Sequence, residues 1–373
     1  MKQRHLISLR DYTSEDIEEI FDLAARVKAD PQAYGGVLQG KSLAMIFQKP
    51  STRTRVSFEV GMFELGGTAL HLGSDDIQLQ RGESIADTAR VLSRLVDGIM
   101  ARVFAHQDIL DLARYGTVPV INGLSDLLHP CQALADYFTI RERRGSLDGL
   151  KVAYVGDGNN VCHELMFGAL KLGMAMSVGC PEGYAPNQLI VKSASREAQK
   201  LGSPVPEVMA DPMAAVEGAD VVYTDVWTSM GQEAEAEARL QAFQGYMVTT
   251  EMMALASPEA LFMHCLPAHR GEEVEAEVID GPQSVVFDAI ASAVDRLGPR
   301  PRVSDLAVAK LLDALTHDKK ARNGRAVFIL PTAIGQVVVK GDVDRGEIKH
   351  ALKVLAAREV LLDGDGDGDG DRG

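Results

Sequence analysis

The sequence predicts an α/β protein with two doubly wound parallel-sheet domains. Short apolar runs of strand length alternate with amphipathic helical segments through most of its 373 residues, a pattern typical of parallel sheets with right-handed crossovers. The charged, glycine-containing segment 141–149 interrupts this alternation, which restarts with the strand-like run KVAYV (151–155). We therefore expect a first domain over residues 1–147, a second over 148–300 and an atypical C-terminal extension over 301–373.

The expected strands are marked by their length, their apolar content and the turn residues after them. In the first domain they are SLAMIF (42–47), TALHL (68–72), DGIMAR (97–102) and VPVIN (118–122). In the second domain they are KVAYV (151–155), AMSVGC (175–180), PVPEVM (204–209), DVVYTDVW (220–227) and LFMH (261–264). TSED (13–16) predicts the capped start of a helix. In the extension, residues 325–341 are strand-like, and DGDGDGDGDRG (363–373) predicts a disordered acidic tail.

Composition argues against several classes of function. The formal charge of −15 disfavours non-specific nucleic-acid binding. The sequence has no apolar run close to the ~20 residues that span a bilayer, and residues 1–13 lack the apolar core of a signal peptide. Cysteines without CxxC spacing indicate reduced thiols in a cytoplasmic protein rather than disulfides or a zinc cluster. They are Cys131, Cys162, Cys180 and Cys265.

The segment STRTR (51–55) combines hydroxyls and arginines at a predicted helix start. It follows a strand and Pro50, and Ser51 and Thr52 are favourable N-cap residues. A helix N-terminus attracts anions, and the arginine fork matches phosphate geometry. A solvated basic helix start is the simpler interpretation, but the density of these groups favours a phosphate or carboxylate site. The apolar face of this helix should comprise Val56, Phe58, Val60, Phe63 and Leu65.

Further polar groups lie in the first domain. Gln78 and Arg81 belong to a polar loop, and Arg102 ends a strand, where ligands bind in open α/β sheets. HPCQ (129–132) begins a helix, and its histidine and amide can donate to a carbonyl or accept from an NH₂ group. Taken alone, Arg102 is equally well a surface arginine and His129 a helix-capping residue.

The second domain offers a glycine turn and an acidic turn. GDGNN (156–160) follows a strand, but Val161 stands where a dinucleotide fingerprint needs its third glycine, so an amino-acid-binding turn fits better. Asp225 also follows a strand, with Ser229 and a glycine turn behind it. A buried aspartate beside a hydroxyl suits a cationic amine, whereas an Asx-type turn is the structural alternative.

HCLP (264–267) raises the hypothesis of a thiolate nucleophile, because histidine and cysteine are adjacent. Neighbouring residues of a strand point to opposite faces, so His264 is poorly placed as a base for Cys265. This argues against a cysteine protease. A free cysteine is also often a small core residue.

Together these motifs resemble the aspartate/ornithine carbamoyltransferase family in order and approximate spacing. The resemblance covers residues 1–288 and rests on STRTR, a loop glutamine, a strand-end arginine, HPCQ, DGNN, DxxxSMG and HCLP. An aspartate substrate would need cationic groups for its carboxylate, whereas Asp225 offers a negative charge. The sequence is therefore similar to the ornithine-specific type. Such a member transfers the carbamoyl group of carbamoyl phosphate to the δ-amine of L-ornithine, giving L-citrulline and phosphate in arginine biosynthesis or degradation.

The resemblance also implies where the site lies and which residues form it. The active site would occupy the cleft between a carbamoyl phosphate domain and an ornithine domain. Carbamoyl phosphate would be bound by Ser51, Thr52, Arg53, Thr54, Gln78, Arg102, His129, Gln132, Cys265 and Leu266, with Gln78 reaching a neighbouring subunit's site. Ornithine would be bound by Asn160, Asp225, Ser229 and Met230. The catalytic groups would be Cys265, Arg102, His129 and Asp225.

The family needs no metal or cofactor, and the resemblance implies a homotrimer or a multiple of trimers. One departure stands out. The family places an arginine about five residues after the aspartate that matches Asp288, whereas the ungapped position here is Ala293, and Arg296 would serve only after an insertion. The altered segment after residue 288 keeps a second hypothesis open, a non-catalytic ligand-binding member. A nicotinamide dehydrogenase is a third, disfavoured by the broken fingerprint.

Overall fold

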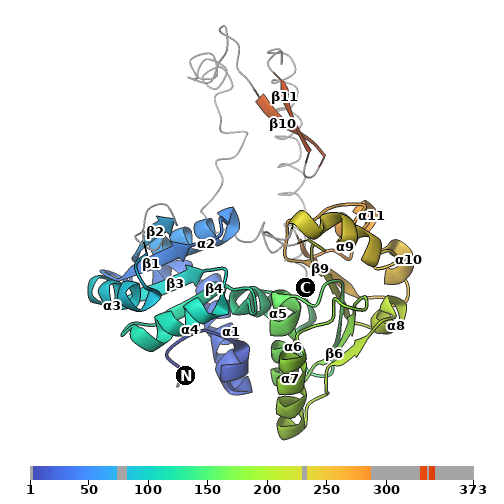
Figure 1. Cartoon of the computed structure of the whole chain (residues 1–373), viewed down its shortest axis with the longest axis horizontal. Helices are drawn as coiled ribbons and strands as arrows, with labels where there is room; N and C mark the ends of the chain where they lie inside the picture. Colours follow the sequence, from blue (N-terminus) through green and yellow to red (C-terminus); the bar gives the residue numbers. More distant parts are fainter. Residues whose placement is uncertain (1–2, 74–81, 229–232, 287–327, 334–335, 341–373) are drawn as a thin grey trace, which may run out of the picture. The chain divides into compact units, whose positions relative to one another are not determined.

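The computed structural model describes residues 3–73, 82–228, 233–286, 328–333 and 336–340. The chain divides into two compact units, Met1–Ala289 and Ile290–Gly373. The first unit holds two separate parallel sheets, each with helices of its own (Figure 1). The predicted α/β fold with two doubly wound parallel-sheet domains is thus confirmed.

The first sheet has the strand order β2-β1-β3-β4, and all its pairs are parallel. Its strands are β1 (Ser42–Phe47), β2 (Thr68–Gly73), β3 (Gly98–Arg102) and β4 (Val120–Leu124). Its helical segments are η1 (Leu9–Asp11), α1 (Ser14–Ala29), η2 (Pro31–Tyr34), α2 (Thr52–Glu64), α3 (Ile85–Leu95), α4 (His106–Tyr115) and α5 (Pro130–Arg144). In the register of β1 and β3, Phe47 lies beside Arg102. The chain therefore leaves β1 for the STRTR segment next to that arginine.

The second sheet has the order β7-β6-β5-β8-β9 and is also parallel. Its strands are β5 (Lys151–Val155), β6 (Ala175–Gly179), β7 (Glu207–Met209), β8 (Val221–Thr224) and β9 (Leu261–His264). Its helical segments are α6 (Asn160–Lys171), α7 (Gln188–Leu201), α8 (Pro212–Val216), η4 (Glu233–Glu235), α9 (Ala236–Ala242), α10 (Thr250–Met253) and α11 (Ala276–Ile279). Thr224 pairs with both Val155 and His264. Gly156, Asp225 and Cys265 therefore leave the sheet as neighbours.

Capping and burial explain why the main elements form where they do. The predicted capping box of α1 is present, since the Thr13 hydroxyl accepts from the Asp16 N–H at 3.1 Å and the Asp16 carboxylate from the Thr13 N–H at 3.3 Å. Helix α6 is buried from Val161 to Lys171 and packs against α5, α7 and η1. A helix with no exposed face is fixed from all sides, so α6 holds the GDGNN turn at its N-terminus rigidly.

Helix α2 departs from the expected packing. Its predicted apolar face is not buried within the chain: Phe63 is 79% and Val56 49% exposed, and no residue of α2 is buried. Phe58 alone of the expected five packs against the small core cluster under β1. The periodicity correctly predicted a helix but not its partner, because an apolar stripe looks the same whether it meets its own sheet or another molecule.

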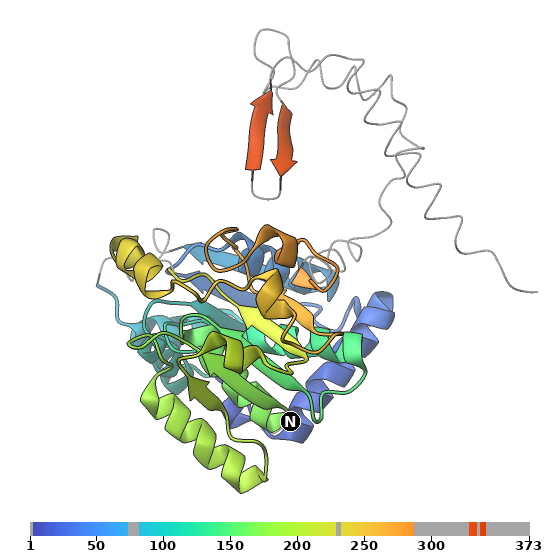
Figure 2. The same ribbon diagram turned by 90° about the vertical axis from the view of Figure 1, so that its right-hand side faces the viewer.

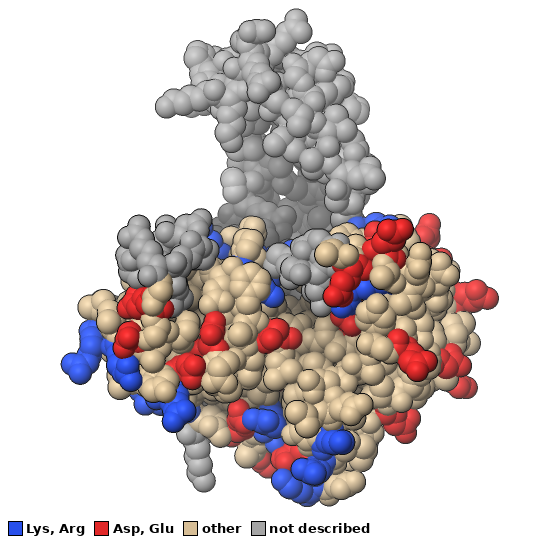
Figure 3. Space-filling model, viewed as in Figure 1, with Lys and Arg blue, Asp and Glu red and all other residues tan. Residues whose placement is uncertain are grey.

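Charged side chains on the view in Figure 3 are of both signs and interspersed, with acidic ones gathered over α9, where Glu235 and Glu237 lie. This distribution agrees with the acidic composition. Among the described helices, none is long and apolar enough to cross a membrane.

In the second unit the structure describes an antiparallel hairpin of β10 (Phe328–Ala333) and β11 (Gln336–Lys340), shown in Figure 2. It falls within the segment predicted to be strand-like. The expected acidic tail, residues 363–373, lies outside the described residues. The domain boundaries at 147/148 and 300/301 stay predictions.

A buried carboxylate joins the N-terminal segment to the second sheet's helices. Glu164 of α6 has no exposed surface, and its Oε1 accepts from the Ser8 hydroxyl at 3.1 Å and the Leu9 N–H at 2.5 Å. Burial raises the pKa of Glu164 from 4.5 to about 8, although both hydrogen bonds oppose the shift. The folded chain therefore retains a proton that the unfolded chain releases, and stability from this group is lost as pH rises from 4.5 through 8.

We predict that Glu164→Gln, which keeps the acceptor oxygen but cannot ionise, removes this loss. Between pH 6 and pH 8 the free energy of unfolding of the unmutated protein should fall by about 2 kcal/mol more than that of the variant. Urea unfolding at the two pH values measures this difference. Glu197→Gln is the matched control, because hydrogen bonding to Lys171 lowers the pKa of Glu197 and places its titration below pH 4.5. An unchanged pH dependence in Glu164→Gln would contradict the prediction.

Candidate active site

The STRTR segment forms the first turn of α2 at the carboxyl end of β1. Ser51 is the N-cap, and its hydroxyl lies 3.3 Å from the Thr54 N–H and 3.0 Å from the Thr54 hydroxyl. Thr52 is exposed on the same turn. The Arg53 guanidinium reaches the HCLP loop, where its Nη2 donates to the Leu266 carbonyl at 2.5 Å. The segment therefore presents amides, hydroxyls and a cation together, and links the two sheets.

Arg102 at the end of β3 is only 8% exposed. Burial, and then the positive charge of Arg53, lower the pKa of Arg102 to about 10, so it remains a cation at neutral pH. Within the described part of the chain its buried Nε–H has no hydrogen-bond partner. A buried cation beside another cation, with an unused donor, favours an anionic ligand. The surface-arginine alternative is wrong.

His129 occupies the N-cap position of α5 but makes no capping hydrogen bond with its side chain. Burial, and then the charge of Arg102, lower the pKa of His129 to about 3, so the ring is neutral. Its Nδ1 is buried and has no partner among the described residues. A neutral imidazole beside Arg102 can donate to a carbonyl oxygen without adding a second charge. His129 is therefore the N-cap residue by position, but its side chain does not cap the helix.

Gln132 follows one turn later on α5. Its Nε2 donates to Oδ1 of Asp136 at 3.0 Å, so the amide is held by a carboxylate of the same helix. Sequence reasoning did not single out Asp136. An acid one helical turn after a site residue was the available signal.

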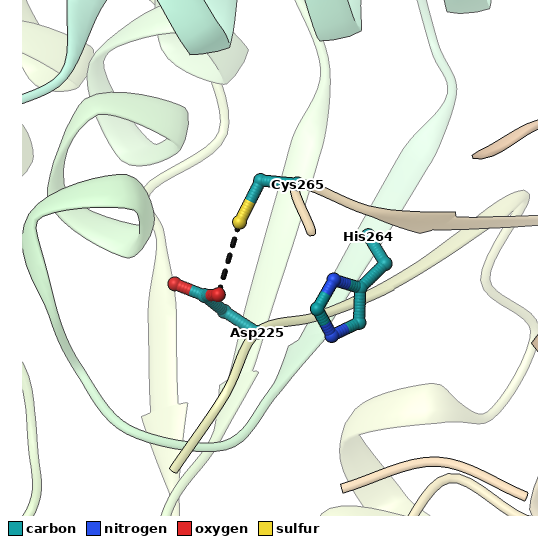
Figure 4. Close-up of side chains that lie close together, drawn as sticks. All are labelled: Asp225, His264 and Cys265. Atoms are coloured by element: carbon teal, nitrogen blue, oxygen red, sulfur yellow. Dashed lines mark hydrogen bonds between the residues drawn. The ribbon is translucent and has the colours of Figure 1, made fainter. Parts of the chain in front are cut away.

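Asp225 follows β8 and is 6% exposed. Its Oδ1 accepts from the Val226 N–H at 2.8 Å and from the Cys265 thiol at 3.0 Å, and its Oδ2 accepts from Asn159 Nδ2 at 2.7 Å. Figure 4 shows the thiol pointing at the carboxylate. The side-chain donors come from the turn after β5 and the loop after β9. Asn159, which the sequence did not assign to the site, is thus a direct partner of Asp225.

Cys265 is a thiol rather than a thiolate. Burial, followed by the charge of Asp225, raises the pKa of Cys265 well above its usual range. Both nitrogens of His264 are engaged elsewhere: Nδ1 accepts from the Leu266 N–H at 2.8 Å, and Nε2 lies 3.2 Å from Oε1 of the fully buried Glu273. His264 therefore cannot serve Cys265 as a base. This geometry agrees with the argument against a cysteine protease.

The same histidine shapes the HCLP loop. Leu266 has a left-handed backbone, φ +58°, which is unusual for a branched residue, and its N–H is held by His264. Oε1 of Glu273 also accepts from the His269 N–H at 2.5 Å. These bonds fix the loop so that the Leu266 carbonyl faces Arg53 and the Cys265 thiol faces Asp225.

The comparisons with known proteins decide the family. A model described as the carbamoyl-P binding domain of aspartate/ornithine carbamoyltransferase matches residues 4–142, and one described as its Asp/Orn binding domain matches residues 148–293. This chain belongs to the aspartate/ornithine carbamoyltransferase family. The resemblance inferred from the motifs is confirmed.

Individual members of the family match this chain over most of their own length. The ornithine carbamoyltransferase of Symbiobacterium thermophilum is 57% identical over 313 residues, 83% of this chain and 99% of the relative. A Pyrococcus furiosus relative named as anabolic is 58% identical over 288 residues, 76% and 91% of the two chains. The solved ornithine carbamoyltransferase from Pyrococcus furiosus superposes with a TM-score of 0.74 at 57% identity, covering 78% of this chain and 93% of that one.

Several family positions fall outside the described residues. Gln78, Ser229 and Met230 do, as do Arg81, Asp288, Ala293 and Arg296, so their roles stay predictions. Asn160 is described, and its Nδ2 donates to the Ser125 carbonyl at 2.6 Å. This bond joins α6 to the segment after β4, and an additional role of Asn160 toward an amino acid also stays a prediction.

Asp225, His264 and Cys265 each bring one potential ligand atom within 4.8 Å of the others. Each of these side chains is already hydrogen-bonded, and a metal would need the deprotonated thiol, whose pKa is raised. The donor set is therefore better suited to hydrogen bonding than to ligation. His269, Glu272 and Glu273 form a similar but more exposed group.

We predict that Asp225→Asn raises the rate at which iodoacetamide modifies Cys265 at pH 8 by three- to tenfold, because removing the carboxylate charge lowers the pKa of the thiol. Quantifying the Cys265 peptide by mass spectrometry measures the rate. Asp157→Asn is the control, since Asp157 is also buried but pairs with Arg239 at 3.0 Å. Equal acceleration in both variants would indicate general loosening and contradict the prediction.

Proposed function

We propose that this protein transfers the carbamoyl group of carbamoyl phosphate to the δ-amine of L-ornithine, producing L-citrulline and phosphate. The observation that carries this proposal is the placement of opposite charges at the carboxyl ends of the strands of the two sheets. Arg53 and Arg102 lie at the carboxyl end of the first sheet, and the buried Asp225 carboxylate lies at the carboxyl end of the second. The Arg53–Leu266 hydrogen bond spans the two edges and supports a single site in the cleft between them.

Carbamoyl phosphate would bind with its phosphate at the start of α2. The amides of the first turn, the hydroxyls of Ser51, Thr52 and Thr54, and Arg53 supply donors for its oxygens. Arg102 and the neutral His129 would bind the carbamoyl oxygen, using the donors that are unpaired in the described structure. Gln132 and the Leu266 carbonyl would accept from the carbamoyl NH₂.

Ornithine would bind with its δ-amine at Asp225 and Cys265. An alkyl ammonium has a pKa near 10, and it cannot attack until it loses a proton. The Asp225 carboxylate can hold the ammonium and accept that proton, while the Cys265 thiol orients it. The amine nitrogen then forms a bond to the carbonyl carbon, and negative charge develops on the oxygen beside Arg102, His129 and Thr54. The C–O bond to phosphate breaks, and phosphate leaves into the α2 site.

We also propose a homotrimer and a cytoplasmic location. The exposed Phe63 and Val56 of α2 support self-association, because a large apolar side chain that its own chain leaves uncovered is a natural contact for another subunit. Gln78 would then reach the neighbouring site. The four cysteines are all free in the structure, which suits a reducing compartment.

We expect the full-length protein to form citrulline from ornithine and carbamoyl phosphate, and Arg53→Ala to lose at least 100-fold in kcat/KM, as for other removed charge-stabilising donors. Arg55→Ala is the matched control. Arg55 lies on the same turn but pairs with Glu59 at 2.9 Å, so it should retain activity within about fivefold. Colorimetric detection of citrulline measures both.

Two outcomes would point elsewhere. Carbamoyl phosphate binding by calorimetry without turnover, in folded protein, would favour the non-catalytic ligand-binding member. Turnover of putrescine or N-acetylornithine but not ornithine would change the substrate and leave the reaction class intact.

Arg296→Ala tests the family's C-terminal arginine. Weakened carbamoyl phosphate binding in this variant would assign that role to Arg296.

A further inference from the structure

We infer that Asp136 is a positioning residue that fixes which end of the Gln132 amide faces the carbamoyl group. It thereby makes the site select a carbamoyl NH₂ over a methyl group of the same size. This inference rests on the proposed function, because it concerns the carbamoyl phosphate half of that site.

Asp136 is held between the two halves of the molecule. It lies on α5 and is 5% exposed. Its Oδ1 accepts from Gln132 Nε2 at 3.0 Å, and its Oδ2 accepts from the Tyr223 hydroxyl at 2.9 Å. Tyr223 is 1% exposed, lies on β8 two residues before Asp225, and stacks on Tyr154 with centroids 5.9 Å apart. The carboxylate is therefore fixed from the first domain's helix and from the second domain's sheet.

Burial raises the pKa of Asp136 to about 7, so the group is ionised above that pH. An ionised carboxylate only accepts hydrogen bonds. The Gln132 amide must therefore turn its NH₂ toward Asp136, and its Oε1 is left as the end that can meet a ligand. The two ends of an amide are nearly identical in shape, so shape alone would not prevent the reverse orientation. The orientation is decided by the partner, and above pH 7 the partner is a buried, ionised carboxylate that accepts from both Gln132 and Tyr223.

This polarity matters for carbamoyl phosphate in particular. Its NH₂ is a donor and needs acceptors, which Gln132 Oε1 and the Leu266 carbonyl can supply. A reversed amide would bring NH₂ against NH₂ and leave buried donors unpaired, which costs more than a missing contact. Acetyl phosphate carries a methyl group in place of the NH₂. Its affinity should therefore depend little on the orientation of Gln132.

The decisive variant is Asp136→Asn, whose amide can donate as well as accept and so permits either orientation of Gln132. We expect the dissociation constant of carbamoyl phosphate to rise at least tenfold, and that of acetyl phosphate to change less than threefold. Isothermal titration calorimetry with each ligand measures both constants, at a pH well above 7 so that Asp136 is ionised. The readout is the ratio of the acetyl phosphate constant to the carbamoyl phosphate constant, which Asp136→Asn should lower. A change in charge or stability near the phosphate affects both ligands alike and leaves this ratio unchanged.

Two variants separate positioning from a structural role. Tyr223→Phe removes one hydrogen bond to Asp136 but leaves the carboxylate, so it should keep the ratio unchanged. Gln132→Ala should lower the ratio as Asp136→Asn does, and adding Asp136→Asn to it should change the ratio no further. If Asp136→Asn fails to fold, Asp136→Ser carries the same expectation, since serine also donates and accepts.

A ratio unchanged in Asp136→Asn, or lowered equally in Tyr223→Phe, would overturn the inference. Citrulline formation by the unmutated protein is measured first. If that reaction is absent, the proposed function has failed; if it is present and the ratio does not move, the role of Asp136 has failed by itself.

Discussion

The buried Asp225 carboxylate is the group on which the arrangement of the second sheet's edge depends. An unpaired charge in the interior is costly, so its position requires donors to be brought to it. They arrive from its own turn, from Asn159 at the start of α6 and from Cys265 after β9. The register of β5, β8 and β9 makes this convergence possible by ending the three strands side by side. Any further ligand of the Asp225 carboxylate must compete with these donors.

At the carboxyl end of the first sheet the buried charge is positive instead of negative. Arg102 and His129 both have lowered pKa values, because burial and neighbouring positive charge disfavour protonation. Unpaired donors on both side chains mean that part of this electrostatic cost is unrelieved within the described structure. In the proposed function a dianionic ligand relieves this cost, so affinity for phosphate follows from the same burial that makes the positive charges costly. In the proposed function the first sheet supplies the anion site and the second sheet the amine site.

Most of the described residues of the candidate site could be predicted from the sequence, because of where they lie relative to the strands. STRTR, Arg102, HPCQ, Asp225 and HCLP all lie at or shortly after the carboxyl end of a strand, and these ends meet at the same side of a parallel sheet. The partners of these residues were harder to find. Tyr223 and Glu273 act through tertiary hydrogen bonds, which leave no local pattern. The helical spacing of Gln132 and Asp136 was a local signal that went unused, and Asn159 was read as part of a turn rather than as a donor. The exposed face of α2 was missed because periodicity reports an apolar stripe without identifying what covers it.

The thiol beside Asp225 has a consistent physical role in this setting. The carboxylate already accepts from a backbone amide, a side-chain amide and Cys265, so an arriving ammonium must compete with one of them. A thiol is the weakest of the three donors. Displacing the thiol costs least, and in the proposed mechanism the amine nitrogen then lies next to Cys265. The raised pKa of the thiol, which would be a defect in a nucleophile, keeps it a neutral donor that, in the proposed mechanism, gives way to the amine.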